Sequence, residues 1–253
     1  MHILVTNDDG VQAPGLLALV QEMCKLGKVT VFAPDKNWTA SGHAKTMERP
    51  LRVRETTLAD GYPALASDGA PSDCVALPLL GLVEEKIDLV ASGINPSANI
   101  GHDVTYSGTV TAAMEAAIAG VPGIAVSLDS PNHSSSLDYK TAAIIARRVA
   151  EQVINGGLPK DVLLNVNVPY LKEAEIKGYA ITRQGLRVYR DALDERIDPR
   201  GEPYYWIGGE APTGVDEPGT DFGALRAGYV SITPLQLDLT AREAMERLKN
   251  WEF

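Results

Sequence analysis

The feature of this 253-residue sequence that most constrains its fold is the alternation, over the first two thirds, of short apolar runs with segments of helical periodicity. This alternation is typical of βαβ units, in which helices connect parallel strands and cover the sheet. We therefore expect an α/β fold of three layers, with a Rossmann-like, mostly parallel sheet between two layers of helices. The predicted strands are 2–6, 28–33, 87–92, 123–127 and 162–168, and the predicted helices are 14–25, 72–82, 108–119 and 137–154.

The last third of the chain has a different texture. From about Glu175, tyrosine, glycine and proline recur in KGYAITRQGLRVYRD and GEPYYWIGGE, which is typical of β-hairpins outside the main sheet. A final amphipathic helix is predicted at 240–251, with Thr240 as N-cap and Glu243 completing a capping box. We expect residues 1–174 to form an α/β core and residues 175–253 to form a hairpin and helix extension that packs with the core as one domain.

Composition excludes several classes of partner. The net charge of -10 argues against binding to a nucleic-acid polymer, which requires a basic face. The longest apolar stretch, 74–83, is too short to span a bilayer and contains Pro78, and no signal-peptide pattern is visible. Cys24 and Cys74 both lie in apolar contexts and are predicted to be buried thiols. We expect a cytoplasmic protein that binds no membrane.

Polar segments follow three of the predicted strands. Asn7-Asp8-Asp9-Gly10 follows the first strand, APDKNWTASGH at 33–43 follows the second, and SGINPSANIGHDVTYSGT at 92–109 follows the third. Because ligands of parallel sheets bind at the carboxyl ends of the strands, we expect these segments to meet at one edge. Asp and Gly are also favoured in turns, so the 7–10 segment taken alone fits an ordinary turn equally well.

Together these segments offer a set of hard oxygen ligands. Asp8 and Asp9 supply charge, and Asn95 supplies a neutral carbonyl oxygen. A hydroxyl group from Thr39 or Ser41 completes the set. Such ligands suit Mg²⁺ or Mn²⁺, whereas the lack of paired His or Cys spacing argues against zinc.

A candidate anion site lies in the segment YSGTVTAA at 106–113. Hydroxyl groups and Gly108 stand where the chain enters an alanine-rich predicted helix, whose free N–H groups and dipole attract phosphate. The same Ser-Gly-Thr sequence also fits an ordinary N-cap. The nearby Asn95 and Asn99 favour the phosphate interpretation.

Five other polar residues carry weaker predictions. His2 and His133 lie in no acid-base setting and are expected to be incidental. His43 and His102 lie in the candidate loops, where a structural hydrogen bond is more common than catalysis. Arg183 either reaches the site from the extension or forms a surface salt bridge.

In several ordered motifs the chain resembles the survival protein SurE family of nucleotidases, and the resemblance covers nearly the whole chain. It implies a metal-dependent phosphatase that hydrolyses nucleoside monophosphates as a 5'-nucleotidase, with breadth toward 3'-nucleotides and short polyphosphate. The motifs are ILVTNDDG at 3–10, APDKNWTASGH at 33–43, GAPSDCV at 69–75, SGIN at 92–95, NIGHDVTYSGTVTAAMEA at 99–116, ITRQG at 181–185, YYWIGG at 204–209 and GYVSITPLQLDLT at 228–240.

The resemblance implies one divalent ion per subunit, Mg²⁺ or Mn²⁺, held by Asp8, Asp9, Thr39 and Asn95. The family usually has serine where this chain has Thr39, so Ser41 remains an alternative hydroxyl ligand. Asp8 could also act as nucleophile or base in place of a water molecule. The residues implied to be catalytic are Asp8, Asp9, Asn99 and Ser107, and those implied to bind substrate or phosphate are Gly42, His43, Asn99, Ser107, Gly108 and Thr109.

The family resemblance further implies that residues 1–174 form the catalytic core and that the extension is exchanged or packed between subunits of a homodimer or homotetramer. Two rival functions remain. A Rossmann-type dinucleotide enzyme fits poorly, because the first strand is not followed by G-x-G-x-x-G and two carboxylates there would repel a pyrophosphate. A non-catalytic metal- or nucleotide-binding module would use the same residues without turnover.

Overall fold

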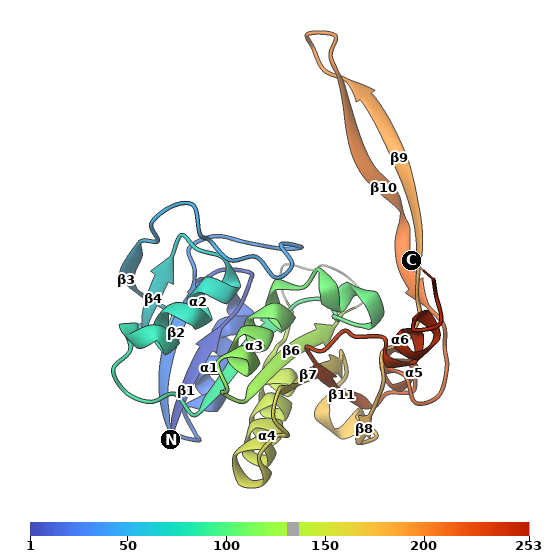
Figure 1. Ribbon diagram of the computed structural model, residues 1–253. Helices are drawn as coiled ribbons and strands as arrows, with labels where there is room; N and C mark the ends of the chain where they lie inside the picture. The colour runs from blue at the N-terminus through green and yellow to red at the C-terminus, as the bar shows by residue number, and fades with distance from the viewer. Residues whose placement is uncertain (131–136, 253) are drawn as a thin grey trace.

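A computed structural model of the chain describes residues 1–130 and 137–252, without the side chains of residues 210–212, so His133 lies outside the described residues. The strands of the main sheet are β1 (His2–Thr6), β2 (Lys28–Pro34), β3 (Val53–Thr57), β4 (Pro63–Ser67), β5 (Leu89–Asn95), β6 (Gly123–Asp129), β7 (Val162–Pro169), β8 (Tyr179–Ile181) and β11 (Val230–Gln236). Over the described residues their order is β3-β4-β2-β1-β5-β6-β7-β11-β8 (Figure 1).

Helices cover both faces of this sheet (Figure 1). The α-helices are α1 (Pro14–Met23), α2 (Pro71–Leu77), α3 (Gly108–Ile118), α4 (Lys140–Gly156), α5 (Asp221–Arg226) and α6 (Arg242–Leu248), and the shorter turns are η1 (Pro78–Leu82), η2 (Gly101–Thr105) and η3 (Glu173–Glu175). Alternation along β1 separates two apolar clusters: Ile3 and Val5 pack with residues of α1 and α4, whereas Leu4 packs with residues of α2 and α3. The predicted three-layer α/β fold is therefore confirmed.

The parallel strands lie at the centre of the sheet. Strand β1 pairs in parallel with β2 and β5, and β6 pairs in parallel with β5 and β7. The carboxyl ends of these strands consequently share one edge, as the sequence predicted. The sequence analysis missed β3 and β4, which pair antiparallel to each other and extend the sheet beyond β2. The predicted helix at 72–82 is divided into α2 and η1, with Gly81 at a φ of 114°.

The C-terminal third corrects two expectations. Strands β9 (Arg187–Ile197) and β10 (Pro203–Gly214) form a hairpin outside the main sheet that projects away from the body of the molecule (Figure 1). Strands β8 and β11, in contrast, lie within the main sheet, where β11 pairs antiparallel to β7. The predicted cap of the last helix is also wrong: α6 begins after Ala241, and the N–H group of Thr240 instead donates to the Asp238 carboxylate.

The two thiols differ in exposure. Cys74 is buried between α2 and the sheet, as predicted. Cys24 is exposed, which corrects the prediction, because it lies just beyond the last turn of α1. In the described parts of the chain, none of the helices has the length and apolar character needed to cross a membrane.

Candidate active site

The turn after β1 is built by Asn7 and Gly10. The Asn7 side chain donates to the Gly10 carbonyl at 3.0 Å and accepts from the Gly10 N–H group at 3.2 Å. Gly10 has a φ of 102°, a conformation that other residues rarely adopt. Because these two residues account for the turn, the adjacent carboxylates of Asp8 and Asp9 are not needed to form it.

The Asp8 carboxylate is packed against the start of α3. Asp8 is only 4% exposed, and the Thr109 hydroxyl donates to its Oδ1 at 2.5 Å. Burial raises the pKa of Asp8, while hydrogen bonds from Thr109 and from the backbone of Gly108 lower it in part. A methyl group added at Gly108 would lie 2.6 Å from Asp8 Cβ, so glycine permits this close approach. The anion at this helix N-terminus is thus the Asp8 carboxylate.

Asp9 lies beside Asp8 and is half-buried. Burial and the neighbouring charge of Asp8 raise the pKa of Asp9 to about 7. Because the pKa of Asp9 is higher in the folded chain than its unfolded value of 3.8, the contribution of Asp9 to the stability of the fold is fully present below pH 3.8. This contribution is lost as the pH rises toward 7. Near neutral pH, a proton or a cation therefore relieves the repulsion between the two carboxylates.

A second loop meets this pair through its backbone. The N–H group of Trp38 donates to the Asp8 carbonyl at 2.8 Å and fixes the loop that follows β2. In that loop the Thr39 hydroxyl donates to Asn37 Oδ1 at 2.5 Å, so its lone pairs remain for a cation. The Ser41 hydroxyl is buried and makes no hydrogen bond to the part of the chain that the structure describes.

Two asparagines complete the oxygen-rich edge. Asn95, the last residue of β5, donates its amide to the Ser97 carbonyl at 2.6 Å, which leaves its Oδ1 for a cation. Asn99 is 8% exposed and is held from both sides of its backbone. Its N–H group donates to Asn167 Oδ1 at 2.8 Å, and its carbonyl accepts from Asn165 and Asn167 at 2.8 and 3.0 Å.

One cavity of about 840 Å³ brings most of the predicted site residues together. Six of them line it: Asp8, Asp9, Thr39, Asn95, Asn99 and Ser107. Ser107 is the N-cap of α3, and its hydroxyl oxygen accepts from the Val110 N–H group at 3.1 Å. Its hydroxyl proton remains available as a donor. Gly42, His43, Gly108 and Thr109 do not line this cavity, and their contacts with substrate stay predictions.

The outlying candidates have other partners. His43 Nε2 lies 3.2 Å from Glu115 Oε2, and Lys45 Nζ lies 2.6 Å from Glu115 Oε1. The hydrogen bond with His43, together with that from Lys45, lowers the pKa of Glu115 despite its burial. His102 is exposed on η2. Arg183 forms a surface ion pair with Glu217 at 2.5 Å, as its alternative interpretation expected.

The cavity is also lined by residues that the sequence analysis missed. They are Asp103, Asp129, Arg187, Phe222 and Arg226. Three of them come from the C-terminal third, which was predicted to lie outside the sheet, so no spacing in the sequence related them to the strand ends. The only available signal was position, since Asp129 ends β6 and Asp103 lies within the 92–109 segment.

The donors fit a hard divalent cation. Asp8 and Asp9 are acidic, and Thr39 and Asn95 offer neutral oxygens on the same cavity wall. Within residues 1–130 and 137–252, no group of three or more His, Cys, Asp or Glu side chains could hold a metal ion. Any ion here would consequently rely on two carboxylates and neutral oxygens, a donor set that suits Mg²⁺ or Mn²⁺ better than zinc.

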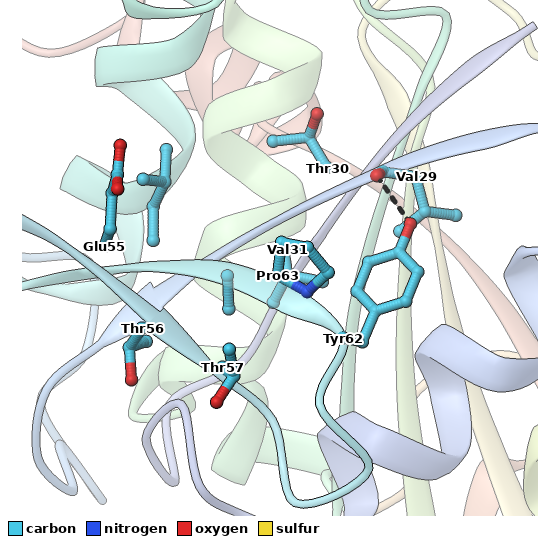
Figure 2. Close-up of a pocket in the computed structure, with 10 residues that line it drawn as sticks. Val29, Thr30, Val31, Glu55, Thr56, Thr57, Tyr62 and Pro63 are labelled. Carbon is cyan, nitrogen blue, oxygen red and sulfur yellow. Dashed lines mark hydrogen bonds between the residues drawn. The ribbon is translucent and has the colours of Figure 1, made fainter.

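A second cavity, of about 780 Å³, lies where β2 and β4 diverge (Figure 2). The Tyr62 hydroxyl spans the gap and donates to the Val29 carbonyl at 2.9 Å, as the dashed line in Figure 2 shows. Its lining is mainly aliphatic and hydroxyl-bearing, with Glu55 as the charged member. It contains neither Asp8 nor Asp9, so the chemistry of the strand ends does not extend to it.

Comparisons with known proteins identify the family. The sequence model of the family described as survival protein SurE matches residues 3–191. The chain is 53% identical to the "5'-nucleotidase SurE" of Herpetosiphon aurantiacus, over 98% of this chain and 97% of that protein. It is 51% identical to the "5'-nucleotidase SurE" of Chloroflexus aggregans over the full length of both. The crystal structure of the SurE protein from Aquifex aeolicus shares 41% identity, with a TM-score of 0.83 and 98% of each chain covered.

Proposed function

Because this chain belongs to the survival protein SurE family, we propose that it is a 5'-nucleotidase, which hydrolyses a nucleoside monophosphate to a nucleoside and phosphate. The observation that carries the proposal is the cavity in which Asp8 and Asp9 meet Asn95, Asn99 and Ser107. Relatives of about the same length that carry this name support it. Activity toward 3'-nucleotides and short polyphosphate is part of the same proposal.

We further propose that Asp8, Asp9, Thr39 and Asn95 hold one Mg²⁺ or Mn²⁺ per subunit. When bound, the ion supplies Lewis-acid chemistry, because it polarises the phosphoryl group, offsets its charge and lowers the pKa of a coordinated water. Burial and repulsion from Asp8, which together raise the pKa of Asp9, support this assignment. Thr39 is preferred over Ser41 because Thr39 lines the cavity and Ser41 does not.

The protein's own groups then orient the substrate. The Thr109 hydroxyl and the start of α3 fix the Asp8 carboxylate, so Thr109 acts by positioning Asp8. Ser107 can donate its hydroxyl proton to a phosphate oxygen while its oxygen caps α3. The Asn99 amide Nδ2 donates one N–H to the Ser127 hydroxyl at 2.8 Å, which fixes the amide and leaves its second N–H for the same group. These neutral donors bind an anion without further charge from the protein.

The test is Asp9→Asn, measured as phosphate release from a nucleoside 5'-monophosphate in Mg²⁺ or Mn²⁺. We expect the rate to fall by about 100-fold or more, because a charged ligand is lost while the size of the side chain is kept. The matched control is Asp161→Asn. Asp161 is exposed just before β7, at the opposite end of the sheet, and its φ of 61° suits asparagine.

Two results would count against this function. Full activity of Asp9→Asn would remove the residue from the site, and an inactive wild-type chain that still binds Mn²⁺ would favour the non-catalytic binding module. The Rossmann-type alternative predicts binding of a dinucleotide, which a fluorescence titration would detect. The cytoplasmic location stays a prediction from the sequence.

We also propose that the β9–β10 hairpin and the rest of the 175–253 extension serve assembly of a homodimer or homotetramer. Isolated two-stranded hairpins are marginal in water, so the projecting hairpin is expected to be covered. Its Leu193 and Ile207 side chains stand opposite each other and are largely exposed. An apolar pair of this kind on an exposed ribbon indicates an interface.

A further inference from the structure

We propose that Asp129 recognises the ribose hydroxyl groups of the substrate, an inference that rests on the proposed nucleotidase function. Asp129 is the last residue of β6 and lines the same cavity as Asp8 and Asp9. Asn95, a proposed ion ligand on β5, is paired in register with Ser127 of β6. Asp129 lies two residues further along the strand, which is about 7 Å. That distance lets a nucleotide whose phosphate is bound near Asn95 reach Asp129 with its sugar.

Besides Asp8 and Asp9, two carboxylates line the cavity, and one of them, Asp103, already accepts hydrogen bonds. Its Oδ2 accepts from Arg187 Nε at 2.7 Å, and its Oδ1 accepts from the Tyr189 hydroxyl at 2.5 Å. The Asp129 carboxylate, in contrast, accepts no hydrogen bond from the described residues. A half-buried carboxylate without donors is costly, and a ligand with hydroxyl groups would supply them. Asp129 is therefore the open acceptor on this wall.

The charges near Asp129 favour a carboxylate there. Burial raises the pKa of Asp129, whereas the positive charges of Arg187 and Arg226 lower it in part. Both arginines line the cavity, Arg187 on the base of the hairpin and Arg226 at the end of α5. A neutral hydroxyl group can bind here without electrostatic repulsion, whereas the Asp129 carboxylate would repel a second phosphate.

Two aromatic side chains also line the cavity. The Phe222 ring packs on the base of the hairpin, where a methyl group added at Gly214 would lie 2.5 Å from it. Tyr106 also lines the cavity and is 62% exposed. Flat rings of this kind stack on nucleobases. The cavity thus combines phosphate-binding groups, an open carboxylate acceptor and aromatic rings, which are the kinds of partner that phosphate, sugar and base require.

The test compares a ribonucleoside 5'-monophosphate with its 2',3'-dideoxy analogue. For the wild-type chain we expect kcat/KM to favour the ribonucleotide by about tenfold or more, mainly through KM, because a site built to accept hydroxyl groups rejects the analogue that lacks them. Asp129→Asn should reduce this ratio by about threefold or more, since a charged acceptor becomes a neutral one. Asp161→Asn removes the same charge at the opposite end of the sheet and should leave the ratio unchanged.

Two outcomes would overturn the inference. One is a wild-type chain that hydrolyses both nucleotides equally well, a result that needs no variant and hence no assumption about folding. The other is an Asp129→Asn variant that keeps the full ratio. Hydrolysis of p-nitrophenyl phosphate by the wild-type chain distinguishes failure of the Asp129 role from failure of the nucleotidase function. If this ester is hydrolysed, only the role of Asp129 fails; if no phosphate ester is hydrolysed, the nucleotidase function fails with it.

Discussion

The four residues that follow β1, from Asn7 to Gly10, have two different roles. Asn7 and Gly10 close the turn through their mutual hydrogen bonds. Asp8 and Asp9 are then free to face the cavity, where each raises the energy of the other's charged form. The proposed divalent cation would relieve this repulsion.

Thr39 is the proposed ligand whose identity departs from the family's usual serine. Thr39→Ser keeps the hydroxyl group, and we expect the apparent affinity for Mn²⁺ to stay within about threefold. Thr39→Val keeps the shape but removes the oxygen, and we expect the affinity to fall by about 10-fold to 100-fold. Isothermal titration calorimetry measures both. Unchanged binding by the valine variant would transfer the role to Ser41, which Ser41→Ala then tests.

Much of this site could be predicted at the level of single residues. Asp8, Asp9, Asn95 and Asn99 follow parallel strands, and the ends of such strands must share an edge. The contact of Thr109 with Asp8 could not be predicted, because it depends on how α3 is seated against β1. The sequence showed only that Ser-Gly-Thr begins a helix, which fitted a phosphate cradle and a carboxylate-capped helix equally well.

At the scale of elements, η2 connects the active site to the hairpin. Asp103 of η2 lines the cavity and binds Arg187 and Tyr189 of β9. The segment between Asn99 and Ser107 is therefore held against the base of the hairpin. Beyond this base, β9 and β10 have no other strand beside them in the described part of the chain. A second copy of the chain is the partner that we propose for it.

The hairpin proposal predicts the effect of Leu193→Asp combined with Ile207→Asp. These side chains share one face, and charges there would oppose burial against another subunit. We expect the mass measured by light scattering after size exclusion to fall to that of a smaller assembly. Arg196→Ala, on the other face of the same ribbon, should leave the mass unchanged. A monomeric wild-type chain would refute the proposal outright.

Elements with a strong periodic pattern were predictable, and the others were not. The five central strands and the helices α1, α3 and α4 follow the periodic pattern, whereas the predicted helix at 72–82 is divided at Pro78. Strand β3 is polar and mostly exposed, and β4 is short and begins with Pro63, so neither has the usual pattern of a strand. Strand β11 contains Pro234, which is unusual within a strand and made this segment hard to predict. The strand nevertheless pairs antiparallel to β7.

The whole molecule poses an electrostatic problem, because a chain with a net charge of -10 is proposed to bind an anionic substrate. Local groups must reverse the sign of the potential at the strand ends. The N-terminus of α3 is already occupied by Asp8, and the guanidinium group of Arg187 is paired with Asp103. The proposed divalent ion would add positive charge beside Asp8 and Asp9.

The most direct test of this account is phosphate release by the wild-type chain after its divalent ions have been removed with a chelator. Activity toward a nucleoside 5'-monophosphate is measured before and after Mg²⁺ or Mn²⁺ is added back. We predict no release above background in the chelated protein and recovery when either ion is supplied, because Asp8 and Asp9 would otherwise repel the phosphate. Undiminished hydrolysis in the presence of the chelator would contradict the central claim.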